Sequence, residues 1–310
     1  MRKTSAVLAS LSLAVLALTG CSVAGSSDGA ACERPADSTG VADAVTVDGD
    51  LGSKPDVSIF APVKITKSAS STVIEGDGRP VENGQQLVVL ELTLFNGQTG
   101  EEVASTAYDP DKGALTNLDN QAERFPALAS AMKCVTEGSR VVVAVSPEDA
   151  GAEALSGFGL GPKDTMVFVA DALDVYLPRA EGELQFNDAS GMPTVVRAPD
   201  GTPGVIIPDS AAPKSQVVQT LIKGEGEKLG ADQIPLVNYT AVNWDTKDLV
   251  DTTWGKSVSL DFAQTAPAVA ETLVGKPVGS QVLVVTPATG DVPATAYVVD
   301  ILGAVTAPTQ

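Results

Sequence analysis

The side chains that usually carry out covalent or metal chemistry are scarce in this chain. It contains no histidine and only three cysteines among 310 residues. Without histidine there is no Ser-His-Asp or Cys-His machinery and no histidine-ligated zinc. The cysteines lie far apart, at Cys21, Cys32 and Cys134, so they form neither a thiolate zinc site nor a Cys-x-x-Cys redox pair. We therefore expect no metal and no cofactor.

The charge of the chain excludes nucleic acids as partners. It has 39 acidic and 20 basic residues, a net charge of −19. Nucleic-acid binding requires a basic surface, so we expect no nucleic acid partner. The same charge repels anionic lipid headgroups, so any membrane contact must depend on a lipid anchor.

The N-terminus has the pattern of an export signal. A basic start at Arg2 and Lys3 precedes an apolar stretch over residues 6–18, and the sequence Leu-Thr-Gly-Cys ends at Cys21. This pattern is typical of a bacterial lipoprotein signal. The stretch is shorter than the roughly 20 residues that span a bilayer. We expect residues 1–21 to be the signal peptide and lipobox, with lipidated Cys21 anchoring the chain at the extracytoplasmic face of the cell membrane. A cleaved signal without a lipid is the alternative.

The other two cysteines meet oxidising conditions in an exported protein. They allow one intramolecular pairing, and we predict a disulfide between Cys32 and Cys134. Such a bond would hold the N-terminal arm on the first domain. In the alternative, Cys134 is a buried thiol and Cys32 is free in the tether.

The elements that must position any site occur twice along the chain. The matching segments keep the same order, and only the loop lengths between them differ. The pairs are 73–78 with 221–226, 87–93 with 234–240, 125–132 with 266–273, and 138–145 with 279–286. The repeat is far longer than a solenoid unit, so it predicts two copies of one domain.

We divide the chain accordingly. Residues 22–44 are rich in Ser, Gly, Ala and Asp and are expected to form a flexible tether. The first domain covers residues 45–177, a polar linker covers 178–192, and the second domain covers 193–305. Apolar runs predict strands at 87–94, 141–145 and 166–169, and at 236–242, 282–285 and 296–299.

One short amphipathic helix is expected in each copy. Apolar residues recur at helical spacing over 125–132 and over 266–273, with Pro126 and Pro267 near the start. About eight residues do not hold a helix alone in water, so each must pack on its sheet. The pattern predicts an α+β fold with an antiparallel sheet in each domain.

With these elements in this order, the chain resembles the FKBP-type peptidyl-prolyl cis-trans isomerases. The second copy carries the likeness best. Gly224 and Gly226 precede the strand that contains Tyr239, and Asp251 follows before the short helix. The paired form behind a lipobox is similar to the tandem FKBP-like lipoproteins of actinobacteria. The resemblance implies two tandem FKBP-like domains, each with an antiparallel sheet curled around one short helix and an apolar pocket between them.

The resemblance also implies site residues in the second copy. Tyr239 and Asp251 correspond to the polar pair of the family pocket and are our catalytic candidates. The positions that line the pocket in the family carry mostly small apolar residues here, and Trp254 could form a lid. The substrate-binding candidates are Val250, Trp254, Val258, Val269 and Val298. In the alternative reading, Tyr239 is a core residue and Asp251 caps a turn.

The first copy departs from the family in another way. Leu92 replaces the tyrosine and Ala104 replaces the aspartate, whereas Phe125, Leu128 and Phe168 keep part of the apolar wall. We therefore expect weak activity in the second domain and little or none in the first.

The implied function is prolyl isomerisation of proline-containing exported polypeptides outside the membrane, by a monomeric protein. This reaction needs no nucleophile, metal or cofactor. An inactive chaperone or polypeptide-binding lipoprotein of the same fold is the alternative. A solute-binding lipoprotein fits less well, because the repeats do not read as α/β lobes around a cleft.

Overall fold

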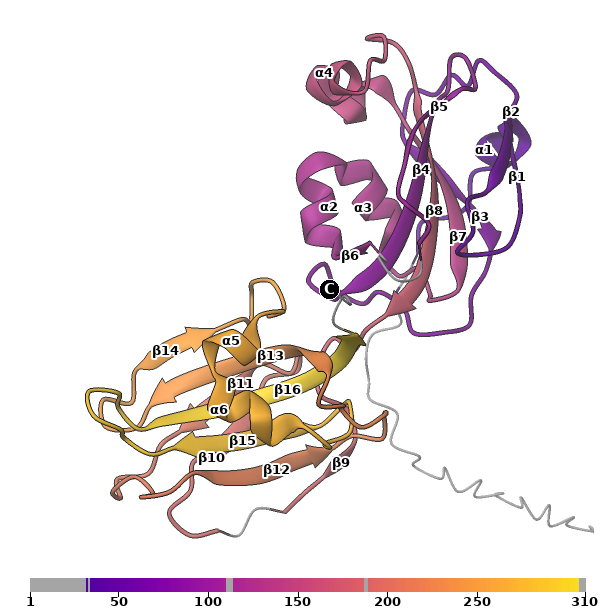
Figure 1. Cartoon of the computed structure of the whole chain (residues 1–310). Coiled ribbons are helices and arrows are strands. Elements are labelled where there is room, and N and C mark those ends of the chain that lie inside the picture. The colour runs from indigo at the N-terminus through magenta and orange to yellow at the C-terminus, as the bar shows by residue number, and fades with distance from the viewer. Residues whose placement is uncertain (1–31, 33, 110–113, 187–188, 307–310) are drawn as a thin grey trace, which may run out of the picture. The chain divides into compact units, whose positions relative to one another are not determined.

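A computed structural model of the chain describes residues 32, 34–109, 114–186 and 189–306 (Figure 1). The expected signal peptide with Cys21, and residues 22–31 and 33 of the expected tether, lie outside these residues. Among the described residues, no helix is both long enough and apolar enough to cross a membrane.

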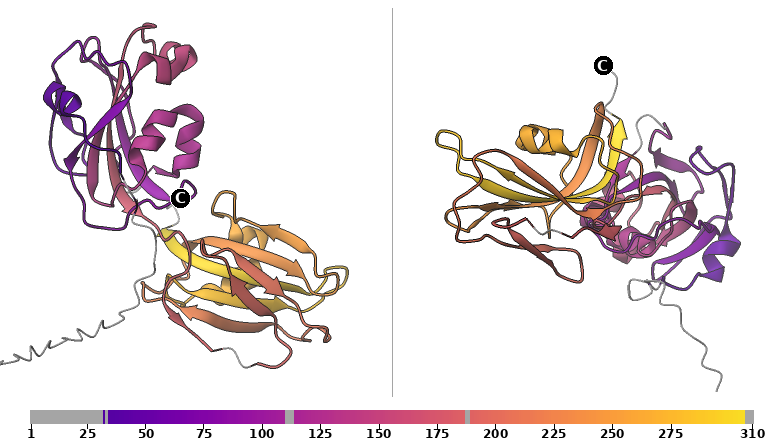
Figure 2. Two further views of the ribbon diagram at one scale, coloured as in Figure 1. Left: turned by 180° about the vertical axis from the view of Figure 1, so that it is seen from behind. Right: turned by 90° about the horizontal axis from the view of Figure 1, so that it is seen from below.

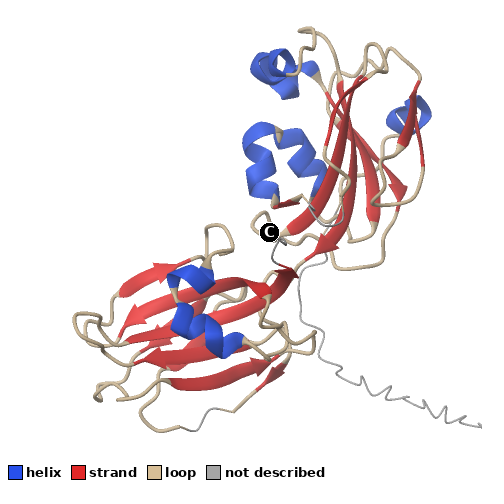
Figure 3. Cartoon of the chain, viewed as in Figure 1, coloured by secondary structure: helices blue, strands red, loops and turns tan. Residues whose placement is uncertain are grey.

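The described chain is built mainly of strands, with short helices between them (Figure 3). The first copy contains α1 (Thr39–Ala44), β1 (Val45–Asp48), β2 (Asp56–Ile59), β3 (Ala69–Ile74), β4 (Val88–Asn96), β5 (Glu102–Ser105), β6 (Leu115–Thr116), α2 (Leu118–Arg124), α3 (Pro126–Met132), β7 (Ser139–Val145), α4 (Pro147–Gly157) and β8 (Met166–Val175). The second contains β9 (Glu183–Leu184), β10 (Thr194–Arg197), β11 (Pro203–Ile206), β12 (Val217–Lys223), β13 (Gln233–Asn243), β14 (Leu249–Thr252), α5 (Phe262–Thr265), α6 (Pro267–Ala270), the 3₁₀ turn η2 (Glu271–Leu273), β15 (Gln281–Thr286) and β16 (Thr295–Thr306).

The two main sheets have the same topology. The first has the order β3-β7-β8-β4-β5, with β6 also paired to β4. The second, read in the same direction, has the order β9-β12-β15-β16-β13-β14, so five strands correspond and β9 is added at one edge. Neighbouring strands in both are antiparallel, as predicted. Register shifts recur at matching places, for example between Thr72 and Ile74 in β3 and between Thr220 and Ile222 in β12. Shared irregularities of this kind support a duplicated domain.

Each sheet is covered on both faces. Helices α2, α3 and α4 of the first copy and α5 and α6 of the second lie against one face. A two-stranded hairpin, β1–β2 or β10–β11, lies against the other face, and in the first copy α1 lies on this hairpin side (Figures 1 and 2). In the second copy, Val237, Tyr239 and Ile301 pack toward the helices, whereas Val242 and Val298 pack toward the hairpin. The hairpin segments also repeat in the sequence, with a Thr-Val pair and a turn containing Gly and Pro at 46–55 and at 194–203, but we did not expect them to form a third layer.

The helices differ from the prediction of one per copy. In both copies the predicted helix begins at a proline and is preceded by a separate short helix, α2 or α5. The break falls at Phe125 (φ −136°, ψ 74°) and at Ala266 (φ −139°, ψ 64°). A residue before proline avoids helical backbone angles because of the proline ring. The first copy also contains α4, within the loop between β7 and β8.

The expected tether and linker are shorter than predicted. Val41 of α1 is buried among residues of the first sheet, and the N–H of Ser38 donates to the carbonyl of Ser70 at 2.7 Å. The last residues of the tether therefore belong to the first copy. Likewise β9, within the expected linker, is a strand of the second sheet. In both cases a few buried contacts order a segment whose composition indicates flexibility.

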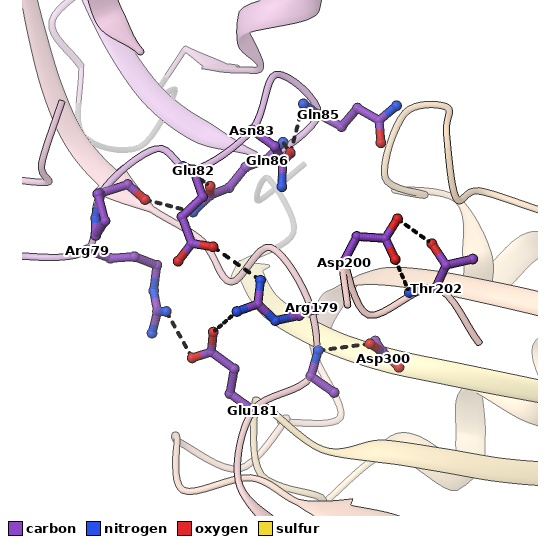
Figure 4. A network of polar contacts seen from close by, with 12 residues as sticks. Arg79, Glu82, Asn83, Gln85, Gln86, Arg179, Glu181, Asp200, Thr202 and Asp300 are labelled. Atoms are coloured by element: carbon purple, nitrogen blue, oxygen red, sulfur yellow. Dashed lines mark hydrogen bonds and ion pairs between the residues drawn. The ribbon is translucent and has the colours of Figure 1, made fainter. Parts of the chain in front are cut away.

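The linker is also bound by polar contacts before β9 (Figure 4). Arg179 pairs with Glu82 at 3.1 Å, and Arg79 pairs with Glu181 at 3.0 Å. The N–H of Ala180 donates to Oδ2 of Asp300 at 2.8 Å. The ion pairs are partly exposed, and such pairs are worth about 0–1 kcal/mol each. The contact with Asp300 is buried and orders the linker more strongly.

The two copies differ in the polar group buried between sheet and hairpin. In the first, Arg140 and Asp171 are fully buried and form a two-pronged ion pair, with N–O distances of 2.6 and 2.7 Å. Arg140 also donates to the carbonyl of Gly49 in the hairpin turn at 2.8 Å. In the second copy Gln281 and Asp300 stand at the same register positions, and Gln281 Nε2 donates to Asp300 at 2.7 Å.

The burial of Asp300 predicts that the stability of the second domain depends on pH. Burial raises the pKa of Asp300 to about 6, and hydrogen bonds from Ala180 and Gln281 with the charge of Arg197 offset only part of that effect. An unfolded aspartate has a pKa of about 3.9. Between these values the folded state binds a proton that the unfolded state lacks, so stability should fall as pH rises, by up to about 3 kcal/mol.

Asp300→Asn removes this titration. Relative to the wild type, its free energy of unfolding should rise between pH 4 and pH 7, as measured by urea denaturation at several pH values. A difference between the two proteins that does not change with pH would refute the assignment.

Candidate functional site

The structure brings the predicted polar pair together on the helix side of the second sheet. Tyr239 lies in β13 and Asp251 in β14, where Asp251 is paired with Ala241, two residues beyond Tyr239. Because residues two apart in a strand share a face, both side chains point the same way. The Tyr239 hydroxyl donates to Oδ2 of Asp251 at 2.5 Å. We call this arrangement the Tyr239–Asp251 site.

The electrostatics keep the proton on the tyrosine. Burial, and then the hydrogen bond to Asp251, raise the pKa of Tyr239 above its ordinary value. The same hydrogen bond lowers the pKa of Asp251, and the N–H of Thr252 at 2.8 Å and Lys256 Nζ at 3.6 Å favour the carboxylate further. At neutral pH the site is a neutral phenol bound to an ionised carboxylate, so it can bind and polarise a ligand but has no acid or base near pH 7.

Apolar side chains form the floor of this site. The ring of Phe262 in α5 lies 4.9 Å from the ring of Tyr239, centroid to centroid. Val269 in α6 is buried in the same cluster, so this predicted residue belongs to the apolar core that contains Tyr239. The short helices thus hold water away from one side of the tyrosine, while the Asp251 side chain is 48% exposed.

Two of the predicted lining residues lie elsewhere. Val298 is buried on the opposite face of the sheet, among Trp244, Val285 and Ala296. Its neighbour Val299 is the residue that pairs with Tyr239, so the predicted position is wrong by one residue and, because strand residues alternate, by one face. Val258 packs with Leu177, Leu236 and Leu302 in a separate cluster, in a segment that is held against β13 by the backbone pairing of Ser259 with Val237.

The other two predicted lining residues, Trp254 and Val250, do not enclose the site either. Trp254 faces the hairpin, since a β-carbon on Gly201 would lie 3.1 Å from its ring. It therefore does not cover the Tyr239–Asp251 site. Val250 lies at a register irregularity in β14 and is 56% exposed. It adjoins Asp251 but points into solvent, and its contact with a substrate stays a prediction.

Tyr297 is a site residue that the sequence did not reveal. In β16 it pairs with Ala241, which pairs on its other side with Asp251. Tyr297 and Asp251 therefore flank a small residue on the helix side of the sheet. Burial raises the pKa of Tyr297, and the charge of Asp251 adds to the effect. Its hydroxyl has no hydrogen-bond partner among the described residues. Only the register of β13 with β16 could have identified it.

The corresponding region of the first copy contains no polar pair. Leu92 and Ala104 occupy the register positions of Tyr239 and Asp251, as the sequence indicates. Three phenylalanines fill the space instead. The ring of Phe125 lies 5.0 Å from that of Phe168 and 5.9 Å from that of Phe158, which follows α4. Leu128 is completely buried beneath them.

The cysteines add no chemistry to the site. Cys32 and Cys134 are both disulfide-bonded, and their pairing with each other stays a prediction. Cys21 lies outside the described residues, so its lipidation also stays a prediction.

Four hollows described in the structure lie away from the Tyr239–Asp251 site. Neither Tyr239 nor Asp251 contributes to any of these four. The largest of them, about 790 Å³, is lined by the linker and by acidic side chains such as Glu137 and Glu227. The candidate site is therefore not part of any of these four hollows.

The solved structures that the chain is similar to include FKBP-type proteins. No protein-family model matches the sequence, and no curated protein matches it. Among the similar structures are the three FKBP domains of wheat FKBP73 (14% identity, TM-score 0.35, 77% of this chain and 94% of that chain) and a peptidyl-prolyl cis-trans isomerase from Pseudomonas syringae (16%, 0.30, 35% and 74%). FkpA from Escherichia coli is another (23%, 0.30, 35% and 47%). All three TM-scores are below 0.5, so these likenesses do not establish the activity of this chain.

Proposed function

We propose that the chain is a peptidyl-prolyl cis-trans isomerase that assists the folding of exported polypeptides at the extracytoplasmic face of the cell membrane, where a lipid on Cys21 anchors it. The observation that carries the proposal is the hydrogen-bonded Tyr239–Asp251 pair above an apolar floor, in a domain whose element order resembles the FKBP family. Slow isomerisation of X–Pro bonds limits folding in any compartment.

The reaction requires no group that this chain lacks. Rotation about the amide bond meets a barrier of about 18–20 kcal/mol, because the planar amide loses resonance as it twists. The twisted amide is less polar, so an apolar surface such as that of Phe262 and Val269 favours it over the planar ground state. Fixed dipoles can hold the substrate without reorganising during the reaction.

The three polar side chains then have different roles. Because the Tyr239 hydroxyl donates a hydrogen bond to Asp251, the two side chains hold each other in one geometry. The carboxylate presents a fixed negative charge beside the bound amide. Tyr297 has the hydroxyl that is free to donate to the substrate carbonyl. Asp251 and Tyr297 thus contact the substrate from opposite sides of Ala241.

Replacing Asp251 with alanine should reduce the activity. We expect at least a tenfold loss in the acceleration of a proline-limited refolding reaction by the full chain, which corresponds to about 1.4 kcal/mol. The loss arises because Tyr239 is no longer held and the fixed charge is absent.

The matched control is Asp248→Ala, which removes an exposed carboxylate from the turn just before β14 and should leave the rate unchanged. An equal effect of the two substitutions would mean that only net charge matters and would remove Asp251 from the site.

The second candidate is a domain of the same fold that binds extended polypeptides without isomerising them. It is favoured by the absence of the polar pair in the first copy and by the four hollows that exclude Tyr239 and Asp251. If the full chain at micromolar concentration does not accelerate proline-limited refolding, this candidate replaces the first.

A further inference from the structure

A hollow between the β10–β11 hairpin and the second sheet lies where the first copy buries an arginine side chain. We propose that this hollow binds a guanidinium group on an alkyl stem, such as an arginine side chain, and that Asp300 pairs with it. We call it the Asp300 hollow, and its lining includes Arg179, Arg197, Ala198, Gly201, Gln281 and Asp300. Val299 and Ile301 face the helices, so Asp300 between them lies on the sheet face opposite Tyr239. The proposal does not depend on isomerisation.

The first copy shows how this part of the fold holds a guanidinium. Asp171 accepts hydrogen bonds from Nε and Nη2 of Arg140 at 2.6 and 2.7 Å. The turn of the β1–β2 hairpin supplies three carbonyls to the same group, those of Gly49, Asp50 and Ser53 at 2.8, 3.0 and 3.3 Å. Both charged side chains are fully buried. The sheet and the hairpin turn therefore form a complete binding site for a guanidinium, which prefers a carboxylate with two-pronged geometry.

The sheet of the second copy keeps the carboxylate of this site but not the arginine. Gln281 pairs with Asp300 across β15 and β16, as Arg140 pairs with Asp171 across β7 and β8. Glutamine is shorter than arginine, and both Gln281 and Asp300 line a hollow of about 310 Å³. A water molecule takes about 30 Å³ in the liquid, so the hollow has room for a guanidinium group and part of its stem.

The hairpin of the second copy also keeps its part of the site. The two hairpins have the same register, and their turns have the same length. The turn residues whose carbonyls bind Arg140 correspond, in order, to Arg197, Ala198 and Gly201. All three line the hollow, and Leu184 and Pro199 add apolar surface for an alkyl stem. Because the contacts in the first copy are made by backbone carbonyls, they do not depend on which residue occupies each position.

Asp300 is a buried carboxylate without a cation in contact. It is 1% exposed and accepts hydrogen bonds from two neutral donors, the N–H of Ala180 (Figure 4) and Nε2 of Gln281. None of the ion pairs found within the described part of the chain includes Asp300. Burial raises the pKa of Asp300 to about 6 despite these hydrogen bonds and the charge of Arg197. A bound guanidinium would supply the positive charge that a buried carboxylate normally has beside it.

Two arginines that line the hollow affect the entry of a cation. Arg179 lies 3.9 Å from Glu181, which offsets part of its charge. Arg197 is exposed, and its Nη1 donates a long hydrogen bond of 3.5 Å to Oε1 of Gln281. Its charge opposes a bound guanidinium, but one long contact leaves its side chain able to turn into solvent. The net charge of −19 attracts cationic ligands to the chain as a whole.

The test measures binding of N-acetyl-arginine N-methylamide to the full chain by two-dimensional ¹H–¹⁵N NMR at about pH 8, where Asp300 is ionised. We expect saturable shifts of the Ala180 backbone amide and the Gln281 side-chain amide. Binding should weaken at least about tenfold in Asp300→Asn, because hydrogen bonds between charged groups are lost. The control Asp248→Asn removes an exposed carboxylate outside the hollow and should bind like the wild type.

Two further variants test the comparison with the first copy. Gln281→Arg reproduces Arg140, so its own guanidinium should fill the hollow and abolish binding of the probe. Arg197→Gln removes the opposing charge and should tighten binding several-fold, whereas an anion site would lose affinity. The spectrum of each variant shows whether it is folded.

Two other ligands define the chemistry. N-acetyl-lysine N-methylamide should bind at least about tenfold more weakly than the arginine probe, since an ammonium cannot pair in two-pronged geometry. Methylguanidinium that binds as tightly as the arginine probe would support the site and identify a small free guanidinium compound as its ligand. Much weaker binding of methylguanidinium would support the site and favour an arginine side chain.

The proposal is overturned if neither the wild type nor Arg197→Gln binds the arginine probe saturably, or if Asp300→Asn and Asp248→Asn bind it equally. Equal binding of the lysine and arginine probes would also contradict it. A chain without isomerase activity that still binds the arginine probe would refute only the proposed function.

Discussion

Replacing Arg140 with methionine is expected to destabilise the first domain by about 3–5 kcal/mol. The reason is the partner that remains, because Asp171 is completely buried and loses both prongs of its ion pair. The turn of the β1–β2 hairpin also loses the guanidinium that binds the carbonyls of Gly49 and Asp50. Urea denaturation should show this as a shift of the first-domain transition to lower denaturant.

Two further variants separate the effect of the unpaired Asp171 charge from the effect of losing the other contacts of Arg140. Arg140→Met/Asp171→Leu removes the unpaired charge and should recover most of the loss, since apolar replacements of a buried ion pair are often neutral. Gln281→Met, at the same position of the second copy, should cost only about 1–3 kcal/mol, because it removes a neutral hydrogen-bond donor and Asp300 keeps the hydrogen bond from the N–H of Ala180. If Arg140→Met shifts stability by less than about 1 kcal/mol, Asp171 is not held as a buried charge.

Truncating Phe262 to alanine should cost about 3–5 kcal/mol and should also disturb the candidate site. This ring has no exposure to solvent and packs at 4.9 Å from Tyr239. Its loss leaves a cavity beneath the tyrosine and removes the apolar floor. We expect the second-domain unfolding transition to move and any isomerase activity to fall with it.

The comparison is Phe158→Ala in the first copy, whose ring is only half-buried at the edge of its aromatic cluster. Phe158→Ala should lower the free energy of unfolding by clearly less than Phe262→Ala does, and it should leave the unfolding transition of the second domain unchanged. Equal shifts of both transitions by either variant would mean that the two copies unfold as one unit, contrary to the separate clusters around Leu128 and Phe262.

The repeat in the sequence was enough to predict much of the fold. Two matched sets of apolar runs predicted antiparallel sheets in both copies, and the structure confirms them. The repeat also aligned Leu92 with Tyr239 and Ala104 with Asp251, and strand register places both pairs at matching positions. These inferences depend only on order and spacing, which duplication preserves.

The positions of the remaining site residues depend on strand register and on loop direction, which the spacing of residues along the sequence does not show. Val298 was chosen instead of Val299 or Tyr297 because a run of apolar residues in β16 does not show which members face the helices. That face is set by pairing with β13 and by the register shift next to Leu236. Trp254 and Val258 follow β14, and the direction of that loop is determined by packing against Gly201 and Leu177.

Segments that composition marked as flexible were ordered by a few contacts. Residues 39–44 contain one large apolar side chain, Val41, and its burial against the first sheet is sufficient to order α1. In the linker, β9 adds a strand to the second sheet through its pairing with β12. Tertiary contacts of this kind leave no periodic signal in so short a segment.

The most direct test of the proposed function is the exchange rate of a single X–Pro bond. Two-dimensional exchange NMR on a short peptide with one Ala-Pro bond should show cis–trans exchange accelerated well beyond the uncatalysed time of about 10–100 s in the presence of micromolar full chain. The acceleration should fall about tenfold with Asp251→Ala and persist with Asp248→Ala. Exchange at the uncatalysed rate with the wild-type chain would contradict the Tyr239–Asp251 site as an isomerase.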